Sequence, residues 1–372
     1  MRKLLFVVNT DKFFHSHRLP IALEAAKQGY EIHVACNITS HDLLTSHGFI
    51  VHPIRLDRSS SGVVSNLATL IDLIKVFNLV SPDIVHLVTI KPVVLGGIAA
   101  RLSNIPAVVF AISGLGHAFS PSRIFAKFRR GLIVFLYRLC LRQNKYKVIF
   151  QNESDLELLS ENCDIPIDKT CLIPGSGVDL NLYHETPMKS GVPVVILASR
   201  LLIDKGVREF AYAAKSLVKD SVKARFVLIG DIDPDNPSSL LESEISQWVD
   251  DGFLEWWGYC DEMYNIFPMS HIVTLPSYYG EGMPKVLLEA AACGRAIVTS
   301  NHPGCRDAIE SNVTGLLVPV KDGVNLMQAI KFLLDNPDVL KRMGKQGRYR
   351  AERCFNIDEV VSKHLDIYSS FF

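Results

Sequence analysis

Several features that mark secreted, metal-rich or nucleic-acid-binding proteins are missing from this 372-residue sequence. It has only eight cysteines and no C-x-x-C pair, so it indicates neither a disulfide framework nor a zinc ribbon. Lysine plus arginine and aspartate plus glutamate both number 39, and this zero net charge argues against a dedicated nucleic-acid-binding protein, which is usually basic. We expect reduced thiols and a cytoplasmic location.

Long hydrophobic runs are also missing. No stretch reaches the ~18 consecutive apolar residues that span a bilayer. The apolar run near the N-terminus ends at Asp11 and Lys12, which predicts a core strand rather than a secretion signal. We therefore expect a protein that is soluble or lies on a membrane surface.

Short apolar segments alternate with amphipathic segments along the whole chain. The segment 108–112 is continuously apolar, which is typical of a parallel strand buried on both faces. The alternation restarts at 194–198, so the sequence predicts an α/β protein with two doubly wound lobes. The predicted lobes cover 1–186 and 187–356, with ligands in a cleft between them at the carboxyl ends of both sheets.

The most informative stretch is 277–294, which follows a predicted strand over 272–275. Pro284 fits the first turn of a helix, where its missing N–H costs nothing. The amides of Met283, Lys285 and Val286 then point towards the end of the sheet, and a helix N-terminus at this place favours an anion.

Two glutamates belong to the same stretch. Glu281 is expected just before the helix and Glu289 inside it, and their spacing of eight residues allows both carboxylates to lie near one helical face. Acidic residues are common in first helical turns, so both could be ordinary helix charges. The apolar neighbours of Glu289 argue against that alternative for this residue.

A pair of cations follows the predicted strand 194–198. Arg200 and Lys205 are presented by a loop beside a helix that begins near Gly206. Two cations suit a diphosphate better than one does, although a solvated loop is the alternative.

Together these stretches resemble the retaining glycosyltransferases of family four, which have the two-lobe GT-B fold. E-G-M-P-K-V-L-L-E, from Glu281 to Glu289, is similar to the E-x7-E signature of the family, and 198–206 resembles its loop with an Arg and a Lys five residues apart. The segments 174–179, 230–231, 303–309 and 315–319 resemble further family elements, so the match covers nearly the whole chain. The resemblance also implies that the last helix, within 357–372, crosses back to the first lobe.

The resemblance implies roles for the charged residues. Arg200 and Lys205 would bind the donor diphosphate and stabilise the departing UDP. Glu281 would hold hydroxyls of the donor sugar, and Glu289 would accept hydrogen bonds from the ribose. Further donor contacts are expected from Gly282, Met283, Pro284 and Lys285.

The first half resembles a subgroup of bacterial transferases that build O-antigen, capsule or N-glycan precursors. The segments 13–20, 88–92 and 113–116 carry this resemblance. It implies transfer of a hexose or N-acetylhexosamine, preferably α-1,3-linked N-acetylgalactosamine, from a UDP-sugar to an undecaprenyl-diphosphate-linked saccharide. His117 is then a candidate catalytic group, with an ordinary loop histidine as the alternative, and His17, Arg18 and Lys91 are candidates for binding the acceptor.

Two departures from common patterns limit these expectations. The segment 9–14 replaces the glycine-rich loop that many family members have after the first strand. Because no G-x-G-x-x-G follows this strand, a nicotinamide-dependent oxidoreductase is disfavoured.

Asp231 and Asp233 resemble the D-x-D of metal-dependent transferases and could hold a divalent ion. We favour a turn containing Pro234 and Pro237, and expect no metal or other cofactor.

The segment 121–147 contains eight lysines and arginines and no acidic residue, with aromatic residues between the charges. This composition is typical of an interfacial helix on anionic lipid, and a core helix with a basic outer face is the alternative. A polyprenyl acceptor would place the enzyme peripherally on the inner face of the cytoplasmic membrane. Nucleic acid is a poor partner because no base-reading element accompanies the charges.

The sequence is also compatible with two other functions. A different nucleotide-sugar donor or a soluble acceptor is the first alternative. A nucleotide-sugar-binding protein without turnover is the second, and the combination of Arg200 and Lys205 with two glutamates favours an enzyme over it.

Overall fold

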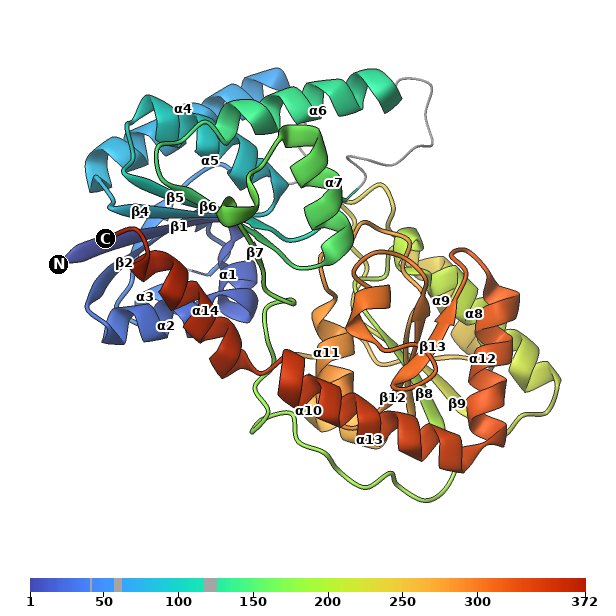
Figure 1. The fold of residues 1–372 in the computed structure, drawn as a ribbon. Coiled ribbons are helices and arrows are strands. Elements are labelled where there is room, and N and C mark those ends of the chain that lie inside the picture. Colours follow the sequence, from blue (N-terminus) through green and yellow to red (C-terminus); the bar gives the residue numbers. More distant parts are fainter. Residues whose placement is uncertain (41, 57–61, 117–125) are drawn as a thin grey trace. The chain divides into compact units, whose positions relative to one another are not determined.

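The computed structural model describes residues 1–40, 42–56, 62–116 and 126–372 of the chain. Its contacts divide the chain into two compact units (Figure 1). The first unit comprises Met1–Ser176 and Ile357–Phe372, and the second comprises Gly177–Asn356.

The first unit is built on a parallel sheet of seven strands in the order β3-β2-β1-β4-β5-β6-β7. The strands are β1 (Arg2–Thr10), β2 (Tyr30–Asn37), β3 (Ile50–Pro53), β4 (Ile84–Val88), β5 (Ala107–Ile112), β6 (Tyr146–Phe150) and β7 (Thr170–Leu172). The helices are α1 (Asp11–His17), α2 (Leu19–Lys27), α3 (Asp42–Thr45), α4 (Val63–Val80), α5 (Ile90–Leu102), α6 (Ala126–Cys140), α7 (Glu153–Cys163) and α14 (Ile357–Ser369).

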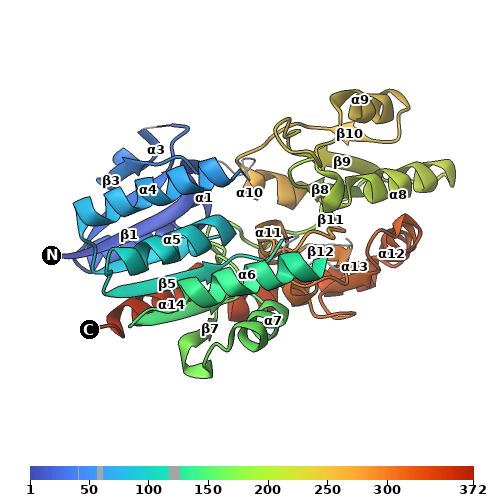
Figure 2. The ribbon, with the colours of Figure 1, turned by 90° about the horizontal axis from the view of Figure 1, so that it is seen from above.

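Helices cover both faces of this sheet, which explains the continuous apolar strands. Leu5 and Val7 of β1 pack in one cluster with side chains of α4, α5, α6 and α7. Leu4, Phe6 and Val8 pack in a second cluster with side chains of α1, α2 and α14. Figures 1 and 2 show α4, α5 and α6 side by side on one face of the sheet. The expectation of a parallel sheet buried on both faces is confirmed.

A short helix, α1, lies between β1 and α2. The side chain of Thr10 accepts a hydrogen bond from the amide of Phe13 and starts α1 directly after β1. Arg18 then interrupts the helical backbone, and Pro20 stands in the first turn of α2, where proline is tolerated.

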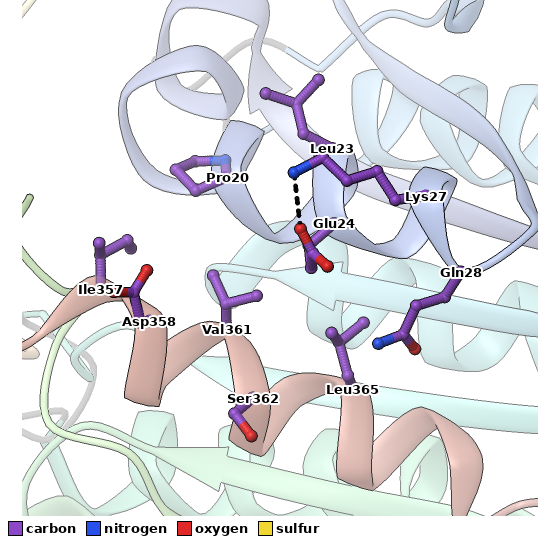
Figure 3. Close-up of a pocket in the computed structure, with 10 residues that line it drawn as sticks. All are labelled: Pro20, Leu23, Glu24, Lys27, Gln28, Ile357, Asp358, Val361, Ser362 and Leu365. Atoms are coloured by element: carbon purple, nitrogen blue, oxygen red, sulfur yellow. Dashed lines mark hydrogen bonds and ion pairs between the residues drawn. The ribbon is translucent and has the colours of Figure 1, made fainter.

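The C-terminal helix α14 belongs to the first unit and packs on α2. The hydroxyl of Tyr368 and Nδ1 of His86 in β4 are 2.6 Å apart. A groove of about 580 Å³ lies between α2 and α14, with Leu23, Val361 and Leu365 among its apolar lining residues (Figure 3). None of the residues predicted to bind substrate lines this groove.

The second unit has a parallel sheet of six strands in the order β10-β9-β8-β11-β12-β13. The strands are β8 (Val194–Ala198), β9 (Arg225–Ile229), β10 (Glu255–Trp256), β11 (Ile272–Leu275), β12 (Ala296–Ser300) and β13 (Gly315–Val318). The helices are α8 (Val207–Lys219), α9 (Glu242–Asp250), α10 (Met263–Ile266), α11 (Lys285–Ala292), α12 (Gly323–Asp335) and α13 (Pro337–Cys354). Side chains of α8 and α12 pack in one core cluster of this unit, and those of α11 pack in another.

The boundary between the units lies ten residues before the predicted one at 186/187. The reason is that the segment after Ser176 already packs on the second unit. The amide of Val178 donates to the carbonyl of Phe355 at 2.8 Å, and the guanidinium of Arg295 donates to the carbonyl of Thr186 at 2.9 Å. These hydrogen bonds make the segment after Ser176 part of the second unit.

Helix α4 is apolar enough, by length and composition alone, to cross a membrane. Leu73, Val76 and Phe77 on its inner side pack in the core of the first unit. Val63 and Val64 at its start are exposed. One side of α4 therefore packs in the core of the first unit, and other side chains of the helix leave an apolar surface exposed.

Candidate active site

Most of the predicted donor residues lie at the carboxyl ends of neighbouring strands of the second sheet. The loop after β8 carries Arg200 and Lys205, and the loop after β11 carries Glu281. Strands β8 and β11 are adjacent, so the two loops leave the sheet side by side. This edge of a doubly wound sheet is where such folds bind ligands.

Close backbone packing fixes these loops. Gly206, just after Lys205, has a φ of +77°, and a Cβ at this position would lie 2.4 Å from the carbonyl oxygen of Pro276 in the β11 loop. Gly304 has a φ of +80°, and a Cβ there would lie 2.6 Å from the carbonyl oxygen of Glu281. Only glycine fits both conformation and space, so the loops hold Lys205 and Glu281 in set positions.

Lys205 and Glu281 form a direct ion pair. The hydroxyl of Ser277 also donates to Oε1 of Glu281 at 3.0 Å. The side chains of Lys205 and Glu281 are only 12% and 14% exposed, so solvent screens this pair much less than a surface pair. The ring of Tyr279 adds a cation–π contact, 5.2 Å from Nζ of Lys205.

Arg200 also has a carboxylate partner. Its NH1 lies 2.6 Å from Oδ2 of Asp233, which follows β9. The turn favoured for this segment is present, since the amide of Asn236 donates to the carbonyl of Asp233 at 2.8 Å. In the described part of the chain, no group of three or more His, Cys, Asp or Glu side chains could hold a metal ion.

Helix α11 begins one residue later than expected. It starts at Lys285, and Pro284 is its N-cap rather than part of its first turn. Glu281 therefore lies in the loop before the helix and Glu289 inside the helix, as expected from the sequence. Gly282 and Met283 belong to the same loop, with the side chain of Met283 buried.

Glu289 lies in the second turn of α11 and is 7% exposed. Burial raises its pKa, while the nearby ammonium of Lys285 and a hydrogen bond with Tyr183 favour the carboxylate. Nζ of Lys285 is 3.4 Å from Oε1 of Glu289. A carboxylate so placed has acceptor capacity for hydroxyl groups of a ligand.

Tyr183 is a residue of this site that the sequence does not signal. Burial raises the pKa of its hydroxyl, and the carboxylate of Glu289 raises it further. Its ring packs near Tyr264 and Phe267, and its carbonyl accepts a hydrogen bond from Arg348, which also donates to the carbonyl of Ala292 in α11. A buried tyrosine in a connecting segment has no sequence signature that separates it from an ordinary core residue.

The predicted acceptor residues belong to the first unit. His17 is half-buried, stacks on Phe13 with ring centroids 4.3 Å apart, and shares a 2.6 Å hydrogen bond with the hydroxyl of Ser16. Lys91 lies in the first turn of α5, after the carboxyl end of β4. His117 lies outside the described residues.

The position of Arg18 differs from the expectation that this residue binds the acceptor. Its side chain is buried, and NH1 donates to the carbonyl of His17 at 2.9 Å. Burial lowers the pKa of Arg18 to about 10, and Tyr368 opposes this shift. A guanidinium enclosed in this way is a structural group of the first unit and is not presented to an acceptor phosphate.

The two doubly wound units and the charged site at the second sheet define a glycosyltransferase of the GT-B class. The crystal structure of Anabaena HepE in complex with UDP and glucose has the same fold, with a TM-score of 0.78, 19% identity and full coverage of both chains. Residues 3–152 match a family model described as "Glycosyl transferase 4-like", and residues 192–336 match "Glycosyl transferases group 1".

Two curated relatives define the family more closely. The first is the N,N'-diacetylbacillosaminyl-diphospho-undecaprenol alpha-1,3-N-acetylgalactosaminyltransferase of Campylobacter jejuni, 30% identical over 82% of this chain and 81% of the relative. The second is the UDP-Gal:alpha-D-GlcNAc-diphosphoundecaprenol alpha-1,3-galactosyltransferase of Escherichia coli, 28% identical over 82% of this chain and 80% of the relative. The chain belongs to glycosyltransferase family four, and both the family and the fold predicted from the sequence are confirmed.

Proposed function

We propose that this enzyme transfers a hexose or N-acetylhexosamine from a UDP-sugar, with retention, to a saccharide linked to undecaprenyl diphosphate. The proposed UDP-sugar donor is supported by one observation, the grouping of Arg200, Lys205 and Glu281 at the carboxyl ends of strands of the second sheet. The acceptor half is supported by the names of both curated relatives, which act on diphospho-undecaprenol-linked sugars. The preferred reaction is α-1,3 transfer of N-acetylgalactosamine.

The charges of the site suit the departure of a diphosphate. As the bond to the anomeric carbon breaks, negative charge develops on the UDP oxygen and positive charge on the sugar ring. Arg200 and Lys205 stabilise the leaving group, and the start of α11 adds backbone dipoles. Glu281 holds sugar hydroxyls and Glu289 the ribose hydroxyls. The proposed reaction needs no metal ion, because the two cations supply the positive charge.

The outer surface of the first unit supports a peripheral position on the cytoplasmic membrane. On α6, Leu132 and Phe135 are exposed apolar residues, and Arg130 is an exposed cation. On α4, Val63 and Val64 are more than 80% exposed. Apolar side chains beside basic ones are what an anionic lipid surface attracts.

Vesicle sedimentation tests the membrane proposal. We expect binding to vesicles that contain anionic lipid, and weaker binding of Phe135→Glu. Val324→Glu provides the matched control, since Val324 is an exposed valine of the second unit. Equal binding of wild type and Phe135→Glu would contradict the proposed surface.

The transfer reaction is tested with a panel of UDP-sugars and a synthetic undecaprenyl-diphosphate amino sugar. Products are scored by mass, with and without EDTA. We expect transfer from one donor, unaffected by EDTA. Tight UDP binding without transfer would direct attention to another acceptor, whereas the lack of any nucleotide binding would reject the proposed reaction.

A further inference from the structure

The donor site contains a carboxylate with no part in the proposed chemistry. Oδ2 of Asp233 lies 2.6 Å from NH1 of Arg200, one of the two cations proposed to bind the donor diphosphate. The Arg200 side chain is 45% exposed and that of Asp233 is 30% exposed, so the pair lies where a ligand can reach it.

The backbone holds Asp233 in place. Its amide donates to the hydroxyl of Ser239 at 2.9 Å. The loop that carries it is bonded to the Arg200 loop, because the amide of Leu201 donates to the carbonyl of Asp231 at 2.9 Å and the amide of Leu240 to the carbonyl of Leu201 at 2.9 Å. The carboxylate is thus on a fixed support, whereas Arg200 is a long side chain that can exchange partners.

We propose that Asp233 is an internal competitor of the donor diphosphate. It neutralises Arg200 in the free enzyme, and Arg200 leaves Asp233 when a diphosphate enters the site. This inference rests on the proposed function, in which Arg200 binds that diphosphate. Asp233 weakens the binding of both the UDP-sugar and the product UDP, and it favours release of UDP after transfer.

The contact between Arg200 and Asp233 assigns a function to Asp233, the second aspartate of the D-x-D sequence. In a metal-dependent site, Asp231 and Asp233 would share a divalent cation. Here the guanidinium of Arg200 stands at the Asp233 carboxylate. A carboxylate that competes with phosphate for Arg200 lowers the affinity only for ligands that carry phosphate. A residue that contacts the nucleoside would change the affinity for UDP and for uridine alike.

The test compares Asp233→Asn with Asp235→Asn. Asp235 is exposed and lies in the same loop, so its variant makes the same change of charge two residues away. Calorimetry with UDP and with uridine is done at low and at high salt, and thermal melting verifies that both variants are folded. Exposed ion pairs are worth 0.2–1 kcal/mol, which corresponds to about 1.5- to 5-fold in affinity.

We expect Asp233→Asn to bind UDP about two- to fivefold more tightly than both wild type and Asp235→Asn. The affinity for uridine stays unchanged, and the gain for UDP shrinks at high salt. The inhibition constant of product UDP falls by the same factor.

Other outcomes overturn the inference. If Asp233→Asn binds UDP no better than Asp235→Asn, Asp233 does not compete. If it binds UDP more weakly, and EDTA weakens the wild type to the same extent, the residue is a metal ligand. If wild-type protein binds no UDP, the proposed function itself fails and this inference falls with it.

Discussion

Lys205 and Glu281, 76 residues apart in the chain, pair with each other at the carboxyl ends of two adjacent strands. Each is the counter-charge of the other in a site with little solvent. Removing one leaves the other charge poorly compensated, which costs more than the loss of an exposed pair.

Replacement of Lys205 by Met or of Glu281 by Gln is expected to lower kcat/KM by about 100- to 1,000-fold, the range for the loss of one preorganised transition-state contact. The double variant should lose much less than the product of the two single effects, since both changes break one interaction. Steady-state kinetics of the three variants measures this coupling. Additive losses, or wild-type rates in the single variants, would show that the pair does not act as a unit in catalysis.

Tyr183 is expected to position Glu289. Tyr183→Phe removes only the hydroxyl that hydrogen-bonds the carboxylate, so we expect several-fold weaker UDP binding and a smaller effect on 2′,3′-dideoxy-UDP. Without the hydroxyl of Tyr183 the pKa of Glu289 rises further. On acidification, the variant should therefore lose UDP binding at a higher pH than the wild type does.

Tyr264→Phe is the matched control for Tyr183→Phe. The two rings lie 6.2 Å apart, but the hydroxyl of Tyr264 is bonded to Glu262. Equal losses in both phenylalanine variants, or equal losses with UDP and its dideoxy analogue, would indicate a packing effect instead of positioning.

Glu289→Gln should stabilise the protein while it abolishes tight UDP binding. Burial raises the pKa of Glu289 in the folded state, so the folded protein binds this proton more tightly than the unfolded chain. Above the folded pKa the buried charge therefore lowers stability, and this loss vanishes below the ordinary pKa of a glutamate, about 4.3. Denaturant unfolding at neutral and acidic pH measures the difference. A variant less stable than wild type at neutral pH would refute the expectation.

The first unit should be sensitive to acid because of His364. Burial, and then the charge of Arg18, lower the pKa of His364 to about 3. The unfolded chain takes up this proton near pH 6.5, so the stability that depends on neutral His364 is present above that pH and is lost as the pH falls towards 3.

His364→Gln should therefore flatten the dependence of Tm on pH in this range. Burial also lowers the pKa of His86, with contributions from His364 and Arg18, so part of the slope will remain. A fully unchanged slope would mean that His364 is not buried in its neutral form.

The periodicity of the sequence was sufficient for the architecture. A parallel strand covered by helices on both faces is mostly apolar along its length, so 194–198 and 272–275 could be located to the residue. The boundary after Ser176 could not be located in this way, because whether a connecting segment belongs to one unit depends on bonds such as that from Arg295 to Thr186.

The sequence by itself determined the two α/β units, the family, and the stretches 198–206 and 281–289 that carry the donor site. Only the tertiary structure decided the partners: Lys205 with Glu281, Arg200 with Asp233, and Tyr183 with Glu289. It also buried Arg18, which in the sequence is indistinguishable from an exposed cation. The physical reason is that local periodicity reports which face of an element is apolar, whereas charge pairing depends on which loops the sheet order brings together.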